Sequence, residues 1–228
     1  MPFRLLLAFA LILLTIRAPL ALAVVAFDNF GPQFGRSTST GVIAAGTNGE
    51  FGKQISGIQF APQTSGLFMQ FFIAASAMDS GRPNDGLRFT LTEDNGDTPG
   101  SALESVVLND VCYVDFDCPE GQLYMLSASS SRLLSAAVSY WLLASSDLPD
   151  GTFIWYLTSE IAPALVYLQD GFTGVFEFSS PPALRVDVTP VVTEVFEPAT
   201  PVLLATLALL IAISIRWFVK GTPRGSFA

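Results

Sequence analysis

Short segments in which apolar and polar residues alternate recur along the middle of the chain. Residues 87–92 and 184–188 alternate strictly, with an apolar residue at every second position. A period of two residues is typical of a strand that has one buried face. Turn-forming sequences at residues 84–86, 94–96 and 149–151 separate such segments. The pattern predicts short strands joined by tight polar turns.

The middle of the chain is expected to hold about ten strands. They are predicted at residues 55–60, 67–74, 87–92, 102–108, 122–127, 138–144, 152–158, 164–168, 174–178 and 184–188. No long stretch carries the apolar stripe of a helix, although residues 129–137 could form a short one. We therefore predict an all-β domain, an antiparallel β-sandwich of jelly-roll-like topology, over residues 24–190.

The first 23 residues have the pattern of a signal peptide. Arg4 precedes an apolar run at residues 5–16, and Ala21 and Ala23 form a small-residue cleavage site. As a helix, twelve residues reach about 18 Å, which is shorter than a hydrocarbon core of about 30 Å. An uncleaved N-terminal anchor is the alternative. We expect signal peptidase to cut this segment and leave Val24 as the mature N-terminus.

Residues 201–219 are predicted to form a transmembrane helix. Residues 201–215 carry no charge, and nineteen helical residues would span about 28 Å. Basic residues follow or end the run, whereas Glu194 and Glu197 precede it. The positive-inside rule then places the basic tail, residues 220–228, in the cytoplasm and the middle domain in the periplasm. The basic side chains are Arg216, Lys220 and Arg224.

The linker at residues 191–200 carries a short motif, Glu197-Pro198-Ala199-Thr200, directly before the hydrophobic run. Motif, hydrophobic run and basic tail together resemble the PEP-CTERM sorting signal, although Phe196 stands where that family usually has proline. The resemblance implies recognition by an exosortase, a membrane protease-transpeptidase, and transfer of the domain to the cell surface or beyond. An ordinary C-terminal anchor is the alternative.

The middle of the chain is strongly acidic. Between Val24 and Val195 there are 19 acidic and 6 basic residues, so the formal charge is 6 − 19 = −13. Such a surface repels nucleic acid, which needs a basic footprint. The chain has no histidine, which excludes Ser-His and Cys-His nucleophile pairs. A hydrolase that uses only carboxylates remains a remote alternative.

Cys112 and Cys118 are the two cysteines of the chain. In an oxidising compartment they are expected to form a disulfide, because an even count leaves no unpaired thiol. Catalytic, cofactor-binding and protein metal sites are not predicted, but acidic turns could hold calcium. The two candidate clusters are Asp94, Asn95 and Asp97, and Asp110, Asp115, Asp117 and Glu120. Solvated turns are the alternative for both.

A second resemblance concerns the middle domain and spans about residues 27–160. Its motifs are residues 27–30, residues 94–96 followed by Pro99, Gly100 and Leu103, and residues 140–142 before Trp155. These motifs are similar to the choice-of-anchor R domain, an exported domain joined to differing C-terminal anchors. The resemblance implies export and anchoring, and it implies no established activity.

The sequence is compatible with three functions. The first is a structural or interaction role at the cell surface or in the extracellular matrix, without catalysis. The second is a carbohydrate-binding module that contacts exopolysaccharide through Tyr140, Trp141 or Trp155, and exposed rings would distinguish it. Burial of these aromatic residues in the core is the alternative for each. The third is a glycan hydrolase.

Overall fold

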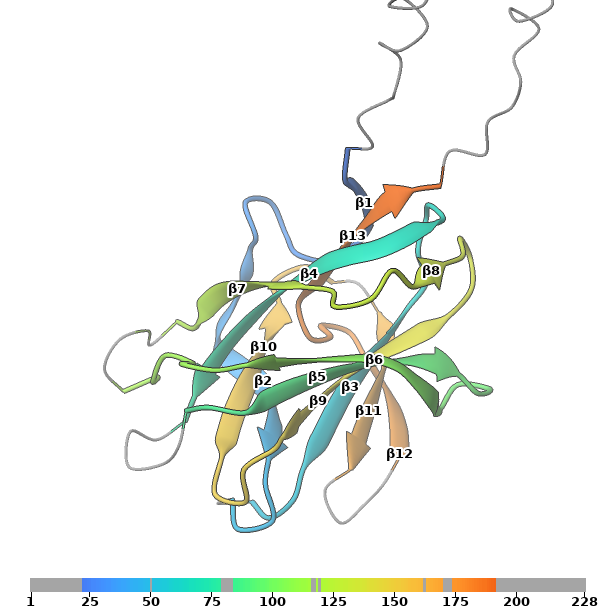
Figure 1. The fold of residues 1–228 in the computed structure, drawn as a ribbon. Coiled ribbons are helices and arrows are strands. Elements are labelled where there is room, and N and C mark those ends of the chain that lie inside the picture. Colours follow the sequence, from blue (N-terminus) through green and yellow to red (C-terminus); the bar gives the residue numbers. More distant parts are fainter. Residues whose placement is uncertain are drawn as a thin grey trace, which may run out of the picture. The chain divides into compact units, whose positions relative to one another are not determined.

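The computed structural model describes residues 22–49, 51–78, 84–115, 118, 120–161, 163–169 and 174–191. These residues form thirteen strands and no helix (Figure 1). The chain divides after Val191 into two units, and every described residue belongs to the first. Within the described ranges, no helix is long and apolar enough to cross a membrane. Residues 1–21 of the predicted signal peptide, the sorting motif, the predicted transmembrane helix and the basic tail lie outside the described residues.

The first sheet has seven strands. Five are connected in the order β1-β13-β4-β10-β2, with β13 and β10 paired along one edge of β4, and β7 and β8 pair with the other edge of β4. All pairings are antiparallel. The strands are β1 (Val24–Asp28), β2 (Arg36–Ala45), β4 (Gly66–Ala77), β7 (Gln122–Ser127), β8 (Leu133–Leu134), β10 (Thr152–Thr158) and β13 (Leu184–Pro190).

The second sheet has six antiparallel strands in the order β12-β11-β3-β9-β5-β6. The strands are β3 (Ile55–Phe60), β5 (Leu87–Asp94), β6 (Pro99–Leu108), β9 (Tyr140–Ser146), β11 (Ala164–Gln169) and β12 (Gly174–Phe178). The expected all-β architecture of two antiparallel sheets is confirmed.

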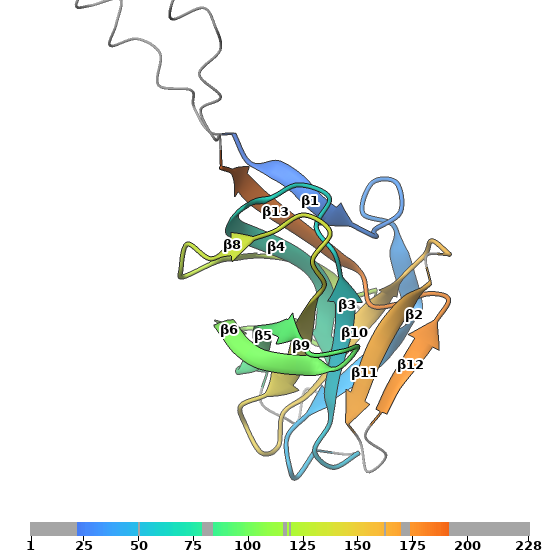
Figure 2. The same ribbon diagram turned by 90° about the vertical axis from the view of Figure 1, so that its right-hand side faces the viewer.

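Aromatic side chains from both sheets meet in the core. Phe89 of β5 lies 5.5 Å from Phe71 of β4 and 5.3 Å from Trp155 of β10, measured between ring centroids. Both contacts are edge-to-face, the arrangement that aromatic quadrupoles favour. Figure 2 shows the two layers that these rings join. The core thus explains why alternate positions of the strands are apolar.

All ten predicted strands are present, and none of their bounds differs from the prediction by more than three residues. Three further strands, β1, β2 and β8, were not predicted. The short helix considered at residues 129–137 is wrong. The backbone N–H groups of Ser129 and Ser130 donate to the carboxylate of Glu104, and Leu133 pairs with Leu67 of β4. Pairing with β4 therefore holds the middle of this segment in an extended conformation, which excludes a helix.

The first and last described strands lie side by side. Val24 at the start of β1 is opposite Val188 near the end of β13. Because the strands are antiparallel, the chain enters and leaves the domain at the same end. This end also contains the start of β4 and the short strand β8.

Candidate functional site

The three aromatic residues considered for stacking on sugar are buried. Tyr140, Trp141 and Trp155 expose 7%, 0% and 1% of their surface. Tyr140 and Trp155 belong to the core, where the indole of Trp155 donates to the carbonyl of Ala183 at 2.9 Å. The prediction that they form a binding platform is wrong, because a sandwich needs its large rings inside.

Trp141 is buried without joining the main core, because the turn after β5 supplies its polar partner. Its indole Nε1 donates to the carboxylate of Asp94 at 2.7 Å, and Gln59 donates to the same oxygen at 2.9 Å. Burial opposes ionisation of Asp94, but these hydrogen bonds and those from the backbone of Gly96 and Asp97 outweigh it and lower the pKa of Asp94. The turn is thus organised around the protein's own donors.

The described residues contain no group of three or more His, Cys, Asp or Glu side chains that could hold a metal ion. In the first calcium candidate, Asp94 and Asp97 both accept hydrogen bonds from Gln59. In the second, Asp110, Asp115 and Glu120 are described, whereas Asp117 lies outside the described residues. The structure therefore gives no support to a calcium site in the part that it describes.

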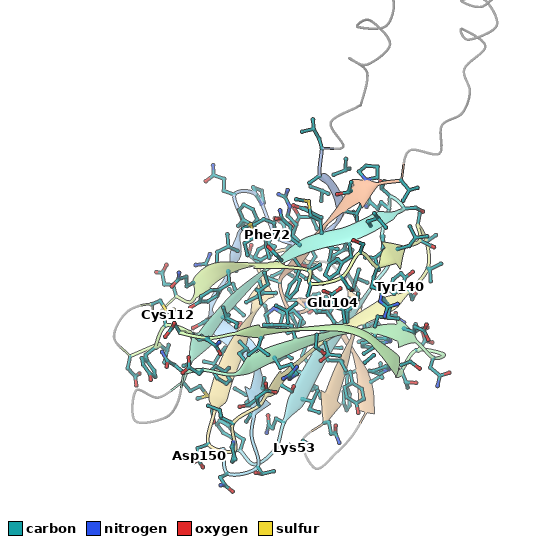
Figure 3. All side chains as sticks on the ribbon, viewed as in Figure 1. Lys53, Phe72, Glu104, Cys112, Tyr140 and Asp150 are labelled. Carbon is teal, nitrogen blue, oxygen red and sulfur yellow. A yellow bond between two sulfur atoms is a disulfide. The ribbon has the colours of Figure 1, made fainter. Side chains whose placement is uncertain are left out.

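The expected disulfide between Cys112 and Cys118 is present, with Cα atoms 6.0 Å apart (Figure 3). The segment that carries it is fixed to the first sheet. The N–H of Cys112 donates to the hydroxyl oxygen of Tyr124 at 2.8 Å, and the carbonyl of Cys112 accepts from the N–H of Ala77. Burial raises the pKa of Tyr124, although its hydrogen bond to Cys112 opposes this.

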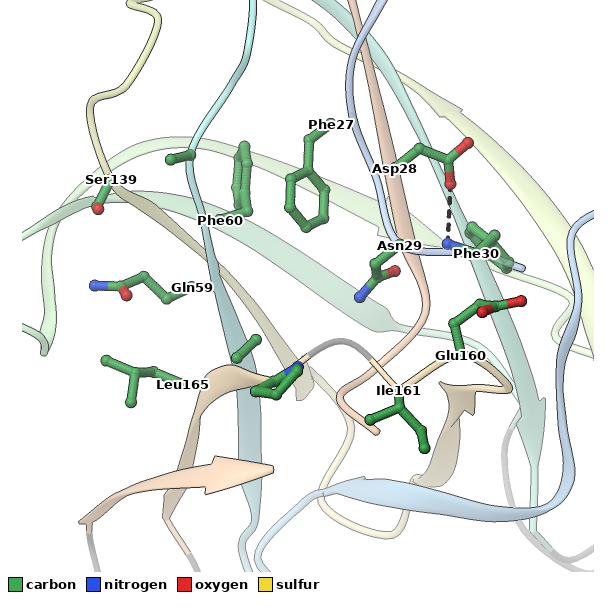
Figure 4. A pocket seen from close by; sticks show the side chains of 13 residues that line it. Phe27, Asp28, Asn29, Phe30, Gln59, Phe60, Ser139, Glu160, Ile161 and Leu165 are labelled. Atoms are coloured by element: carbon green, nitrogen blue, oxygen red, sulfur yellow. Dashed lines mark hydrogen bonds between the residues drawn. The ribbon is translucent and has the colours of Figure 1, made fainter. Parts of the chain in front are cut away.

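A pocket of about 530 Å³ opens beside the end of β3 (Figure 4). Its walls are residues 27–30, 59–61, 139, 160–161, and 163–165. The rings of Phe27 and Phe60 lie 5.4 Å apart on its apolar side. Gln59, Ser139 and Glu160 supply polar groups. Pockets that combine apolar walls with a few polar groups are the usual form of small-molecule sites.

Asn29 fixes the shape of the pocket. Its side-chain amide donates to the carbonyl of Pro182 at 2.9 Å, and its oxygen accepts from the N–H of Leu184 at 2.6 Å. The hydroxyl of Thr158 donates to the backbone carbonyl of Asn29. One buried residue thus joins the segment after β1 to the end of β10 and the start of β13. Both polar atoms of the Asn29 side chain have hydrogen-bond partners within the domain.

Asp28 lies between this pocket and a second hollow of about 290 Å³. Its carboxylate accepts a hydrogen bond from the N–H of Phe30 at 2.9 Å (Figure 4). Desolvation raises the pKa of Asp28; the hydrogen bond from Phe30 and the charge of Arg185 oppose this, and Asp187 adds to it.

Arg185 forms one wall of the second hollow. Its guanidinium lies over the rings of Phe34 and Phe72, at 5.6 and 5.3 Å, and its Nε donates to Asp187 at 2.9 Å. Phe34 reaches this position through a tight turn in which Gln33 and Phe34 have φ angles of 58° and 59°. Left-handed backbone costs about 1–2 kcal/mol per residue, and ring packing against Arg185 favours this turn.

Sequence reasoning did not find the pocket. In the sequence, residues 27–30 indicate only a family resemblance. The hydrogen-bond partners of the Asn29 side chain lie more than 150 positions away along the chain. The conjunction of aromatic, acidic and amide side chains in four residues was the available signal. The described residues that line the pocket include no basic side chain, histidine or cysteine. The pocket can bind a ligand through apolar contact and hydrogen bonds.

No protein-family model matches the chain, and no curated protein matches it in sequence.

Proposed function

We propose that the protein is an exported surface or extracellular-matrix protein, anchored or sorted through its C-terminal segment, with a structural or interaction role and no catalysis. The pairing of Val24 with Val188 carries this proposal. Because the two ends of the domain lie together at the edge of one sheet, the domain can be anchored through its C-terminus while every strand stays paired in its sheet. The disulfide between Cys112 and Cys118 supports an oxidising compartment outside the cytoplasm.

The proposal includes the processing steps that the sequence predicts. Signal peptidase would cut before Val24 and remove residues 1–23. The segment at residues 201–219 would hold the precursor in the inner membrane with its domain in the periplasm. A jelly-roll-like topology is supported by the place of β13 between β1 and β4, since Greek-key chains return a late strand beside the first.

Sorting by an exosortase would require cleavage near Glu197 and Pro198. Proline restricts the residue before it to extended backbone, and a carboxylate is costly in hydrocarbon. Both properties favour a motif that is accessible beside the membrane. We expect two forms in cells that contain an exosortase, the full-length chain and one lacking about residues 198–228. Removal of the exosortase should leave only the longer form, and identical full-length bands in both strains would support a plain anchor instead.

A second candidate function is binding of exopolysaccharide, and the pocket beside Phe27 supports it. The partly exposed ring of Phe27, with hydrogen-bonding groups beside it, suits a sugar ring, which has apolar faces and hydroxyl edges. The absence of a cation among the lining residues and the presence of Asp28 and Glu160 favour a neutral glycan over an anionic one.

Glycan arrays probed with the purified protein would test this second function. We expect retention on neutral glycans that weakens in Glu160→Gln, because the pocket loses its charged acceptor. Glu177→Gln, an exposed change on β12, is the matched control. Equal binding by both variants would exclude this pocket. No release of reducing ends is expected, and such release would favour the remote alternative, a glycan hydrolase.

A further inference from the structure

Exposed apolar side chains gather at the end of the domain where both termini lie. We call this region the neutral surface and define it as residues 24–25, 61–69, 131–139 and 188–191. Its exposed apolar side chains include Val24, Leu67, Met69, Leu133, Val138 and Val191. Large exposed apolar patches are unusual on a soluble surface and mark contacts with a protein or a membrane.

The four segments of the neutral surface are contiguous. Leu67 pairs with Leu133 on one side and with Thr189 on the other. The loop before β4 joins the remaining segments, since the N–H of Gln63 donates to Ala26 at 2.7 Å and the N–H of Ala137 to Pro62 at 2.9 Å. Figures 1 and 2 both show β1, β4, β8 and β13 together at this end.

The neutral surface differs in charge from the rest of the domain. Its four segments contain one charged residue, Arg132, and no Asp or Glu. Every acidic residue that the structure describes lies elsewhere. Glu104, which contacts the adjoining segment, is 7% exposed and accepts hydrogen bonds from Ser129 and Ser130. An acidic domain thus has one apolar end without exposed carboxylates.

The length of the following chain keeps this end close to the predicted anchor. Nine residues, 192–200, separate Val191 from the apolar run that begins at Pro201. Fully extended, nine residues span at most about 30 Å. A bilayer that contains the run therefore lies within this distance of the neutral surface.

We propose that the neutral surface rests on the headgroup region of the bilayer that holds the C-terminal segment, with Leu67 and Leu133 in contact with lipid. The inference rests on the anchoring proposed above. Apolar side chains gain by leaving water at the interface. Carboxylates would be repelled by anionic lipid, and this surface has none. Contact would fix the orientation of the domain and direct its acidic parts away from the membrane.

A lipid-quenching experiment on the full chain tests the contact. A fluorophore is attached at Leu133→Cys or, as the matched control, at Phe176→Cys on β12; the two side chains expose 55% and 46% of their surface. The described cysteines form a disulfide and leave no free thiol. The protein is reconstituted in phosphatidylethanolamine–phosphatidylglycerol vesicles that contain a headgroup nitroxide lipid. We expect loss of fluorescence at position 133, little loss at 176, and a smaller loss at 133 when Leu67→Glu is added.

Equal quenching at both positions, in protein that floats with the vesicles, would overturn the lipid contact alone. Failure of the full chain to float would overturn the anchoring and the contact together. In a third outcome, the nitroxide lipid does not quench the label at 133, and an aqueous quencher does so only after the protein is diluted. This outcome would mean that a second copy covers the surface. That result would also overturn the lipid contact.

Discussion

The carboxylate of Asp94 lies 2.7 Å from the indole nitrogen of Trp141, and it is the hydrogen-bond acceptor of a tryptophan that has no exposed surface. The same oxygen accepts from Gln59. One side chain at the end of β5 therefore satisfies donors from β3 and β9 and ties three strands of the second sheet together.

We expect Asp94→Ala to lower the free energy of unfolding by about 1–3 kcal/mol, the cost of leaving a buried donor without a partner. Urea unfolding followed by circular dichroism would measure it. Asp97→Asn is the control, because Asp97 has a φ of 62° that asparagine tolerates and asparagine keeps a side-chain oxygen that can accept from Gln59. Equal stability of Asp94→Ala and the wild type would show that the hydrogen bond contributes nothing.

The hydrogen bonds to the Glu104 carboxylate lead us to expect that the folded protein loses stability in acid. Burial raises its pKa, but hydrogen bonds from the side chains and backbone of Ser130 and Ser129 outweigh burial and lower the pKa below its ordinary value of 4.5. A carboxyl with a lowered folded pKa stabilises the protein above its unfolded pKa, and this contribution is lost as the pH falls through the folded pKa.

Glu104→Gln should therefore destabilise the protein by about 1–3 kcal/mol near neutral pH. The difference from the wild type should shrink as the pH falls below the ordinary pKa of the carboxyl. Urea unfolding at a series of pH values measures both effects. Glu177→Gln, on the exposed face of β12, should change stability little at any pH. A difference that does not vary with pH would contradict the assignment.

Arg185 and Asp187 form a pair in which Asp187 is 3% exposed. Gln70 donates to its second oxygen at 2.9 Å. Arg185→Met should cost about 2–3 kcal/mol, because Asp187 keeps a charge with one neutral partner. Adding Asp187→Asn should recover part of the loss. The double-mutant cycle is measured by urea unfolding, and strictly additive effects would show that the pair does not interact.

The disulfide should stabilise the domain modestly. It closes a short loop, with a sequence separation of 6, so the chain-closure model gives about 2 kcal/mol. Replacing both Cys112 and Cys118 by alanine should lower the free energy of unfolding by that amount. Reducing agent should destabilise the wild type similarly and leave the variant unchanged. If reductant affected both proteins alike, the disulfide would not be the cause.

Strands with regular alternation could be predicted, because burial of one face fixes a period of two. β2 was missed because its first half is polar and Gly41 interrupts it. The structure explains this glycine: a Cβ atom there would lie 2.3 Å from Ile154 Cγ2 and 2.7 Å from the carbonyl of Trp155. Close approach of a neighbouring strand required glycine, and this requirement is invisible in the sequence.

The candidate site was less predictable than the strands. The aromatic residues predicted to bind sugar have large side chains, and large apolar side chains are the ones that the core buries. Phe27 and Asp28 acquire a pocket only through the distant segments at 59–61 and 160–165. The disulfide was predictable, because two cysteines close in sequence, in a chain with a predicted signal peptide, have few alternatives.

The central claim is that the domain is exported and held by its C-terminal segment. It is tested most directly by fractionating spheroplasts of cells that produce either the full chain or a variant that ends at Val191. We predict that the full chain sediments with the inner membrane and that externally added protease digests its domain, whereas the truncated chain is soluble in the periplasmic fraction. A full chain found in the cytoplasm, or a truncated chain that stays in the membrane fraction after a carbonate wash, would contradict the claim.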